Sequence, residues 1–259
     1  MQVLQRIFAL AKLSALELYR RKDVYTALIL GVAIMLPLAS VNLFGVEGIL
    51  RYLSEVSLLL VWIFSIVIAI STAARQVPLE LERRTVYPLL ARPVRRTEVI
   101  LGKYAGALLA SGSSLVLFYL LFAVLSGVKQ GDWVSATYVQ AFFLHFCFLM
   151  ILVAMVICGS LLFSRSANTA LCGFISVGML LFGTRLPELA AGSHAAAGWF
   201  LDTVHVVAPH FEFFDLRLRV VHGWEALPWG VVAVLGLYAV CYSAAFLGGA
   251  CLLFKRKAL

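Results

Sequence analysis

The densest group of charged side chains in this sequence lies in residues 75–103, RQVPLELERRTVYPLLARPVRRTEVILGK. Acidic and basic residues alternate along Leu79–Val86, directly after Pro78, which suits the first turn of a helix. Pro88 disfavours helical geometry in the residue before it, so we expect this short helix to end near Tyr87. Its charges offer complementarity to another protein. The alternative is a solvated loop whose charges face only water.

Motifs for catalysis are absent from the sequence. Gly102-Lys103 is followed by Tyr104 and lacks the preceding glycine of a phosphate-binding loop, so we expect no ATP binding by this chain alone. HExxH, GxSxG and Cys-His pairs at metal-binding spacing are also missing. The five cysteines are interpreted as small apolar packing residues. The sequence therefore predicts no catalytic residue, no cofactor and no metal site in this chain.

Long apolar runs surround the charged segment. Six runs are long enough to cross the hydrocarbon core of a bilayer, about 30 Å, as helices. They are residues 24–44, 56–74, 104–128, 136–164, 166–184 and 228–254. Charged residues make up only 13% of the chain, about half the share in a soluble domain. We therefore expect an all-α polytopic membrane protein with a single transmembrane domain.

Basic residues are distributed unequally between the two sides of these spans. With the N-terminus in the cytosol, the outer segments hold only Arg51, Lys129, Arg185, Arg217 and Arg219, and the inner segments hold the other 16 of the 21 Lys and Arg residues. Because basic residues resist translocation, both termini and residues 75–103 are predicted to be cytosolic, and residues 185–225 to lie outside. The net charge of +8 then reflects topology and not nucleic-acid binding.

Two further segments are expected to lie at the membrane surface. Residues 1–22 carry apolar side chains at three- and four-residue spacing, which predicts an amphipathic interfacial helix, with an ordinary cytosolic helix as the alternative. Leu189–Leu201 is apolar but short. We expect it to be partly immersed or re-entrant on the outer side, because a seventh span would move Lys255–Lys257 outside.

A few residues in or near the spans are candidates for a translocation pathway or a gate. Asn42 is a polar residue in the first span, and His145 is an ionisable residue deep in the fourth. An intramembrane histidine is a functional candidate, although pairing of a neutral histidine across helices is the commoner explanation. Phe211, Phe213 and Phe214 are candidates for interfacial anchors or for part of an exit gate. Histidines and carboxylates of the outer segment could form a metal relay, but their irregular spacing favours solvated or capping roles.

The third span begins with two local signals. Thr97 can cap the start of the helix, with Glu98 at its positive end. Small residues then recur at every fourth position: Gly102, Gly106, Ala110 and Ser114. This stripe predicts the close approach of another helix, which we expect to come from the same chain and not from a second copy.

Residues 75–103 resemble the cytosolic coupling segment of type-2 ABC transporter permeases, and the six-span layout resembles that family over the whole chain. The matching positions are Glu80, Glu82, Thr85, Leu89, Leu90, Pro93, Arg96, Gly102 and Lys103. Arg84 and Arg95 depart from the family pattern, which usually has Gly and Ser there. The runs LLARPVRRTEVILGK and PHFEFFDLR are also similar to the permease of the exporter that matures nitrous oxide reductase and to its relatives. That likeness implies a cargo related to sulfur or copper.

The resemblance implies a role in which this chain performs no chemistry. A separate cytosolic ABC ATPase subunit would bind ATP and Mg, and a short cytosolic helix seated in its groove would pass its movement to the spans. The residues implied in this coupling are Glu80, Glu82, Arg83, Arg84, Thr85, Arg92, Pro93 and Arg96. The family also implies a second permease copy, identical or different, in the plasma (inner) membrane of a bacterium. It leaves the outer segment available to a periplasmic partner.

Two other functions fit parts of the sequence. A secondary transporter or channel usually needs charged or broken helices at the midplane and often shows internal repeats, neither of which is evident here. A membrane adaptor would use the charged segment to recruit a cytosolic partner without moving a substrate. The sequence favours the permease of an ATP-driven exporter over both.

Overall fold

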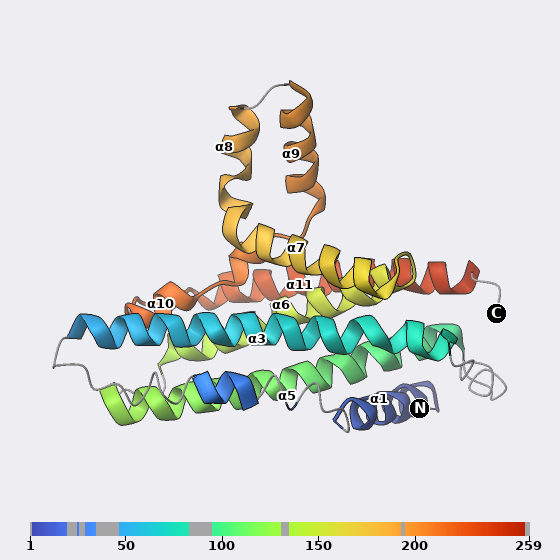
Figure 1. Cartoon of the computed structure of the whole chain (residues 1–259), viewed down its shortest axis with the longest axis horizontal. Helices are drawn as coiled ribbons and strands as arrows, with labels where there is room; N and C mark the ends of the chain where they lie inside the picture. The colour runs from blue at the N-terminus through green and yellow to red at the C-terminus, as the bar shows by residue number, and fades with distance from the viewer. Residues whose placement is uncertain are drawn as a thin grey trace.

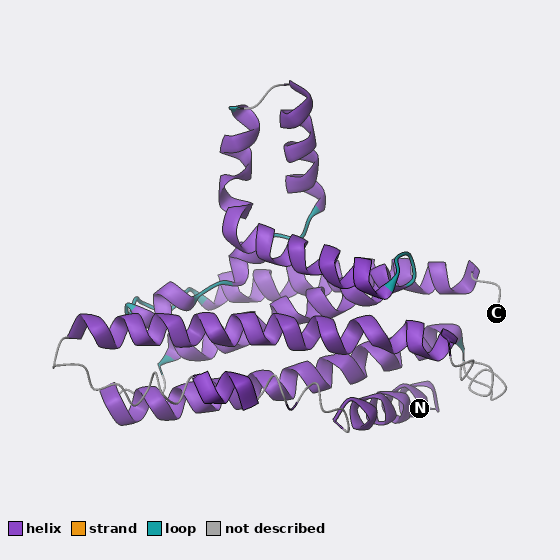
Figure 2. Cartoon of the chain, in the orientation of Figure 1, coloured by secondary structure: helices purple, strands orange, loops and turns teal. Residues whose placement is uncertain are grey.

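The computed structural model describes residues 2–19, 25, 29–34, 47–82, 95–130, 135–192 and 195–256. Every regular element in this part of the chain is a helix (Figures 1 and 2). The elements are α1 (Gln2–Tyr19), α3 (Glu47–Glu82), α5 (Arg96–Gln130), α6 (Ala136–Ser160), α7 (Arg165–Phe182), η1 (Gly183–Arg185), α8 (Leu186–Ala191), α9 (Ala195–Val207), η2 (Phe211–Phe214), α10 (Arg217–Val221) and α11 (Trp229–Arg256). The predicted all-α class is confirmed.

Within the described residues, five helical segments are long and apolar enough to cross a membrane. They are Ser54–Pro78, Arg96–Val124, Ala136–Ser160, Arg165–Ala191 and Trp229–Arg256. These segments correspond to the second to sixth predicted spans, with ends shifted by several residues. The first predicted span, residues 24–44, falls largely outside the described residues, so the count of six spans stays a prediction. The chain is a polytopic helical membrane protein.

The five long helices lie side by side along the long axis of the molecule (Figure 1). Helices α3, α6 and α11 run in one direction, and α5 and α7 run in the other. We call the end at which α5 and α7 begin, and at which the other three finish, the Arg96 end. α1 packs against α5 near this end.

Helix α6 forms the centre of the bundle. It packs against α3, α5, α7 and α11. Its sequence is apolar on all faces, which is the pattern of a helix surrounded by other helices. Leu144, Phe148, Leu152 and Val156 are completely buried along it. The remaining helices are therefore positioned largely by the surface of α6.

Helix α1 packs on α5 through the predicted stripe of small residues. A Cβ atom at Gly106 would collide with the Cβ of Ser14 and would lie 3.0 Å from the carbonyl oxygen of Ala11. A Cβ at Gly102 would collide in the same way with Leu10. Only glycine permits this separation, so the prediction that the stripe serves packing within the chain is confirmed. The position of α1 in the membrane interface stays a prediction.

Helix α3 is longer than the predicted second span. It runs from Glu47 to Glu82 with Pro78 inside, so the predicted start of a separate helix at Pro78 is wrong. A proline removes one backbone hydrogen bond from a helix, and this loss is tolerated where neighbouring groups compensate it. Residues 83–94, which include the predicted helix end near Tyr87, lie outside the described residues.

The segment between α7 and α11 leaves the bundle and then returns to it. After η1 the chain turns aside, and α8 and α9 form a hairpin that projects from the side of the bundle (Figure 1). Leu189–Leu201 therefore does not form a seventh span, while its depth in the membrane stays a prediction. η2 then packs on α6 and α7, and α10 packs on α3 and α6.

Candidate functional site

The structure describes part of the predicted coupling segment. Glu80 and Glu82 belong to the last turn of α3, although the structure does not describe where their side chains point. Six further candidate residues lie outside the described part of the chain: Asn42, Arg83, Arg84, Thr85, Arg92 and Pro93. Their roles stay predictions. What the structure does describe is how the bundle holds both ends of this segment.

Arg96 connects the start of α5 to the end of α11. Its Nη1 donates hydrogen bonds to the carbonyl oxygens of Phe254 and Lys255, each at 3.1 Å. The last carbonyls of a helix have no partner in their own helix, and they carry the negative end of the helix dipole. A guanidinium group therefore binds them well. The two helices are joined at this point, directly after residues 83–94 of the coupling segment.

Glu98 fixes the first turn of α5. Its Oε2 accepts a hydrogen bond from the backbone N–H of Arg95 at 3.1 Å. This bond is one half of a capping box in which Arg95 precedes the helix and Glu98 is its third residue. Thr97 already lies inside the helix, so the prediction that Thr97 caps it is wrong. The placement of Glu98 at the positive end is confirmed.

A polar cluster lies inside the bundle around His145. Nε2 of His145 is 2.7 Å from the hydroxyl oxygen of Ser65, and Nδ1 is 3.3 Å from the hydroxyl oxygen of Tyr119. These side chains come from α6, α3 and α5, and all three are buried. We call Ser65, Tyr119 and His145 the central polar cluster. Pairing of His145 across helices is thus what the structure shows, and a role in translocation stays a prediction.

The hydrogen-bond partners assign a donor and an acceptor to each ring nitrogen of His145. The Ser65 hydroxyl donates to the carbonyl oxygen of Trp62 at 2.9 Å, so its oxygen is left to accept from Nε2–H. Nδ1 then carries the lone pair and accepts from the hydroxyl of Tyr119. Tyr138 donates to the backbone carbonyl of Tyr119 and extends the network along α6. A neutral imidazole can therefore make both of its hydrogen bonds, to Ser65 and to Tyr119.

A stack of side chains connects this cluster to the segment before α11. The Trp62 ring lies on the His145 ring, with centroids 4.1 Å apart. The Arg217 guanidinium lies 5.6 Å from the centroid of Trp62, and its Nη2 pairs with Oδ2 of Asp215 at 2.6 Å. Sequence reasoning missed Trp62, Ser65 and Tyr119. The one available signal was that they are polar or amphipathic residues within otherwise apolar runs.

The three candidate phenylalanines separate into two groups. Phe211 and Phe214 are completely buried, and the Phe211 ring meets the Phe148 ring edge-on with centroids 4.8 Å apart. Phe213 is 48% exposed and stacks on His210. An interfacial anchor must face lipid or water, so only Phe213 has the exposure for that role. A gate function for any of the three stays a prediction.

The histidines near η2 interact with a carboxylate and with each other. Nδ1 of His210 lies 2.9 Å from Oε1 of Glu212, and the His205 ring lies 4.5 Å from the His210 ring. Among the described residues, no three His, Cys, Asp or Glu side chains gather in a way that would hold a metal ion. The His210–Glu212 contact and the packing of His205 on His210 therefore hold η2 to the end of α9.

The comparisons with known proteins agree with this architecture. A family model described as ABC-2 family transporter protein matches residues 4–259, which covers nearly the whole chain. No curated protein matches the sequence. Members of this family are transmembrane subunits without catalytic activity. The chain therefore belongs to the ABC-2 transporter family and is a membrane permease component of an ABC transporter.

Proposed function

We propose that this chain is the permease subunit of an ATP-driven exporter and that a separate ATPase subunit moves it through residues 79–94. ATP and Mg would be bound by that partner, because this chain has no phosphate-binding loop. A second permease copy would complete the translocation path. The Arg96 end would face the cytosol, since α7 begins there with Arg165, which lines a cavity with Arg75, and α11 ends there with Lys255 and Arg256.

The observation that carries this proposal is the continuity of α3. Its 36 residues correspond to a rod of about 54 Å, which is longer than the hydrocarbon core of about 30 Å. The described candidate span of α3 reaches Pro78, and Glu80 and Glu82 follow in the last turn of the same helix. A partner bound to these two residues would therefore act directly on a helix that packs against α5, α6 and α7.

The other end of the coupling segment has an equally direct connection. Residue 95 leads into α5, whose first residue, Arg96, is bonded to the end of α11. A displacement of residues 83–94 would consequently reach α3 from one side and α5 with α11 from the other. These are three of the five helices, among the described residues, that are long and apolar enough to cross the membrane. Movement of one short segment can thus rearrange most of the bundle.

Two short runs of the sequence indicate a class of cargo. Residues 89–103 and 209–217 are similar to the permease of the exporter that matures nitrous oxide reductase. In this chain the second run holds Asp215 and Arg217, which reach the central polar cluster through Trp62. A sulfur- or copper-related cargo, moved outward, is therefore the first class to test.

The test is the ATPase activity of the purified complex with an ABC ATPase subunit co-expressed with this chain. We expect Glu80→Ala/Glu82→Ala to reach the membrane in normal amounts but to reduce stimulated hydrolysis roughly tenfold, because loss of two charges proposed to bind the partner costs about 1–2 kcal/mol. Glu188→Gln/Glu225→Gln removes two exposed carboxylates away from the Arg96 end and serves as the matched control.

The outcomes separate the three candidate functions. A secondary transporter or channel would purify without an ATPase subunit. An adaptor would bind the subunit without changing its hydrolysis. Wild-type stimulation in the Glu80→Ala/Glu82→Ala variant would contradict the proposed coupling.

A further inference from the structure

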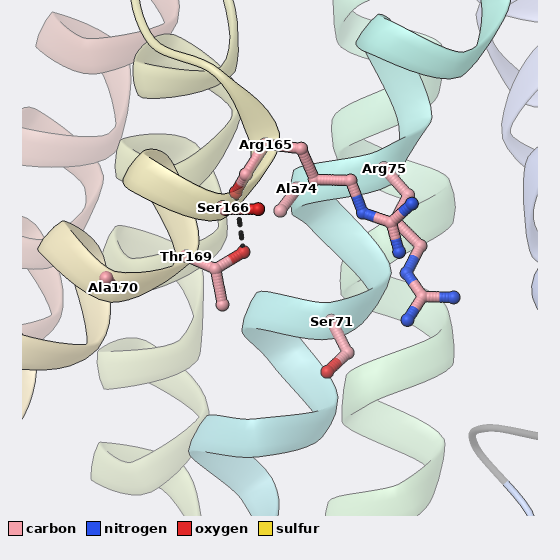
Figure 3. Close-up of a pocket in the computed structure, with 7 residues that line it drawn as sticks. All are labelled: Ser71, Ala74, Arg75, Arg165, Ser166, Thr169 and Ala170. Carbon is pink, nitrogen blue, oxygen red and sulfur yellow. Dashed lines mark hydrogen bonds between the residues drawn. The ribbon is translucent and has the colours of Figure 1, made fainter.

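A cavity of about 380 Å³ opens between α3 and α7 at the Arg96 end of the bundle (Figure 3). Its lining residues are Ser71, Ala74, Arg75, Arg165, Ser166, Thr169 and Ala170. The first three belong to α3 and the other four to the first two turns of α7. The cavity therefore lies where both helices reach the same face of the membrane.

Small side chains explain why the two helices leave a space here. Ser71 and Ala74 of α3 and Ser166 and Ala170 of α7 line the cavity, and none of these four side chains is large enough to fill it. The same separation continues one turn deeper in α7. A Cβ atom at Gly173 would meet only the end of the Ile70 side chain, at 3.8 Å. The cavity is thus a consequence of residue size along both helices.

The lining is strongly cationic. Arg75 and Arg165 contribute two guanidinium groups, and none of the seven lining residues is acidic. Figure 3 shows the Arg165 side chain reaching across towards that of Arg75, so that both guanidinium groups lie on the same side of α3. Two like charges brought together in this way favour an anion between or beside them.

The start of α7 adds hydrogen-bond donors to the same place. Arg165 and Ser166 are the first two residues of this 18-residue helix, where backbone N–H groups have no acceptor in the helix itself. The positive end of the helix dipole also lies here. The Thr169 hydroxyl already donates to the carbonyl oxygen of Arg165 at 2.9 Å, which leaves its own oxygen as an acceptor. Guanidinium and amide donors together suit a group with several anionic oxygens, such as a phosphate.

Exposed apolar ridges lead from the cavity along both helices. On α7, Phe174, Val177 and Leu181 follow Ala170 on the same face, and Phe174 is 79% exposed. On α3, the exposed side chains of Val67, Ile63 and Leu59 precede Ser71 at four-residue spacing. Both ridges run away from the Arg96 end, through the part of each helix that can cross the membrane. A ligand that filled the cavity and also covered these ridges would carry long apolar chains beside its anionic group.

We infer that this cavity binds the phosphate headgroup of an anionic lipid, and that the acyl chains of the lipid lie along the ridges of α3 and α7. Basic pockets between transmembrane helices are suited to such headgroups. The inference does not depend on ATPase coupling, and it holds for whichever leaflet the Arg96 end faces. Free phosphate shares the headgroup chemistry, but it would leave both apolar ridges uncovered.

The experiment is lipid binding by the purified full chain. The chain is titrated with phosphatidylglycerol and, separately, with phosphatidylcholine, and the bound lipids are counted by native mass spectrometry. We expect Arg75→Gln/Arg165→Gln to weaken phosphatidylglycerol binding roughly tenfold or more and to leave phosphatidylcholine binding unchanged, because each basic residue contributes about a factor of five to attraction of an anionic headgroup. The matched control is Lys255→Gln/Arg256→Gln, which removes two exposed charges from the same end of the bundle.

A second variant tests the cavity without changing charge. Ala170→Leu places a larger apolar side chain in the space, so it should also weaken phosphatidylglycerol binding while the chain keeps its thermal unfolding temperature. Sodium phosphate and glycerol 3-phosphate are added as competitors to the wild-type chain. Competition at concentrations near that of the lipid would overturn the assignment to a lipid headgroup. Equal loss of phosphatidylglycerol in the Lys255→Gln/Arg256→Gln control would overturn the assignment to this cavity.

Discussion

The hydrogen bond between His145 and Ser65 allows a quantitative test of how α6 is held to α3. His145→Phe keeps an aromatic ring for the stack on Trp62 and removes both hydrogen bonds of the imidazole. Hydrogen bonds between helices in a membrane contribute about 0.6 kcal/mol on average and up to about 1.7 kcal/mol. The substitution should therefore lower the free energy of unfolding by about 1–3 kcal/mol.

A double-mutant cycle isolates the bond itself. Ser65→Ala also loses the bond to the Trp62 carbonyl, but that loss is the same in both backgrounds and cancels in the cycle. The coupling energy between His145→Phe and Ser65→Ala should be about 0.6–1.7 kcal/mol. It can be measured by titrating the purified chain in mixed micelles with sodium dodecyl sulfate and following helix content by circular dichroism.

Ser176 provides the matched control for this cycle. It is a buried serine whose hydroxyl donates to the carbonyl of Cys172 in its own helix, at 2.7 Å. Ser176→Ala should therefore add to His145→Phe with no coupling beyond the usual error of about 0.3–0.5 kcal/mol. If the coupling energy of the Ser65 cycle is no larger than that of the Ser176 cycle, the hydrogen bond between His145 and Ser65 is refuted.

Two further predictions concern the attachment of segments outside the spans. Gly106→Leu should force α1 away from α5, because the added Cβ would collide with Ser14. Trypsin should then cleave faster at Lys12. Gly248→Leu is the control: a Cβ there meets open space, so the cleavage rate at Lys12 should stay the same. Gln140→Leu should destabilise the chain by about 2–4 kcal/mol in the same detergent titration, because the Gln140 amide donates to the Leu227 carbonyl and accepts from its N–H, both at 2.8 Å. Gln140→Glu keeps an acceptor for the Leu227 N–H but places a buried carboxylate oxygen against the Leu227 carbonyl, so it should destabilise the chain at least as much as Gln140→Leu. Equal stability of all three chains would show that this contact is not formed.

The spans were predictable because their signal is local. A run of about twenty apolar residues identifies a transmembrane helix without any knowledge of its neighbours. The contact made by the glycine stripe was equally predictable, since the missing side chains of Gly102 and Gly106 leave room for the backbone of another helix. The break at Pro78 was predicted wrongly because a rule for isolated helices was applied to a helix held by α5, α6 and α7.

The partners of His145 could not be predicted because they depend on the register of three helices. Ser65 and Tyr119 are 80 and 26 residues away in the sequence, and a rotation of either helix would turn these side chains away. Arg217 was even less accessible to sequence reasoning. It reaches Trp62 only because α10 packs on α3. Position along the chain indicates which residues are polar, and packing decides which of them meet.

The central polar cluster, the basic cavity and the proposed partner site follow one another along α3. Ser65 meets His145 near the centre of the bundle, Arg75 lines the basic cavity, and Glu80 belongs to the last turn of α3. Pro78 separates the last two and cannot donate to the carbonyl of Ala74, which itself lines the cavity. One backbone hydrogen bond of α3 is therefore missing between the proposed partner site and the proposed lipid site. Because the lipid site lies between Glu80 and Ser65 along α3, we expect a bound lipid to alter how movement that starts at Glu80 reaches the central polar cluster.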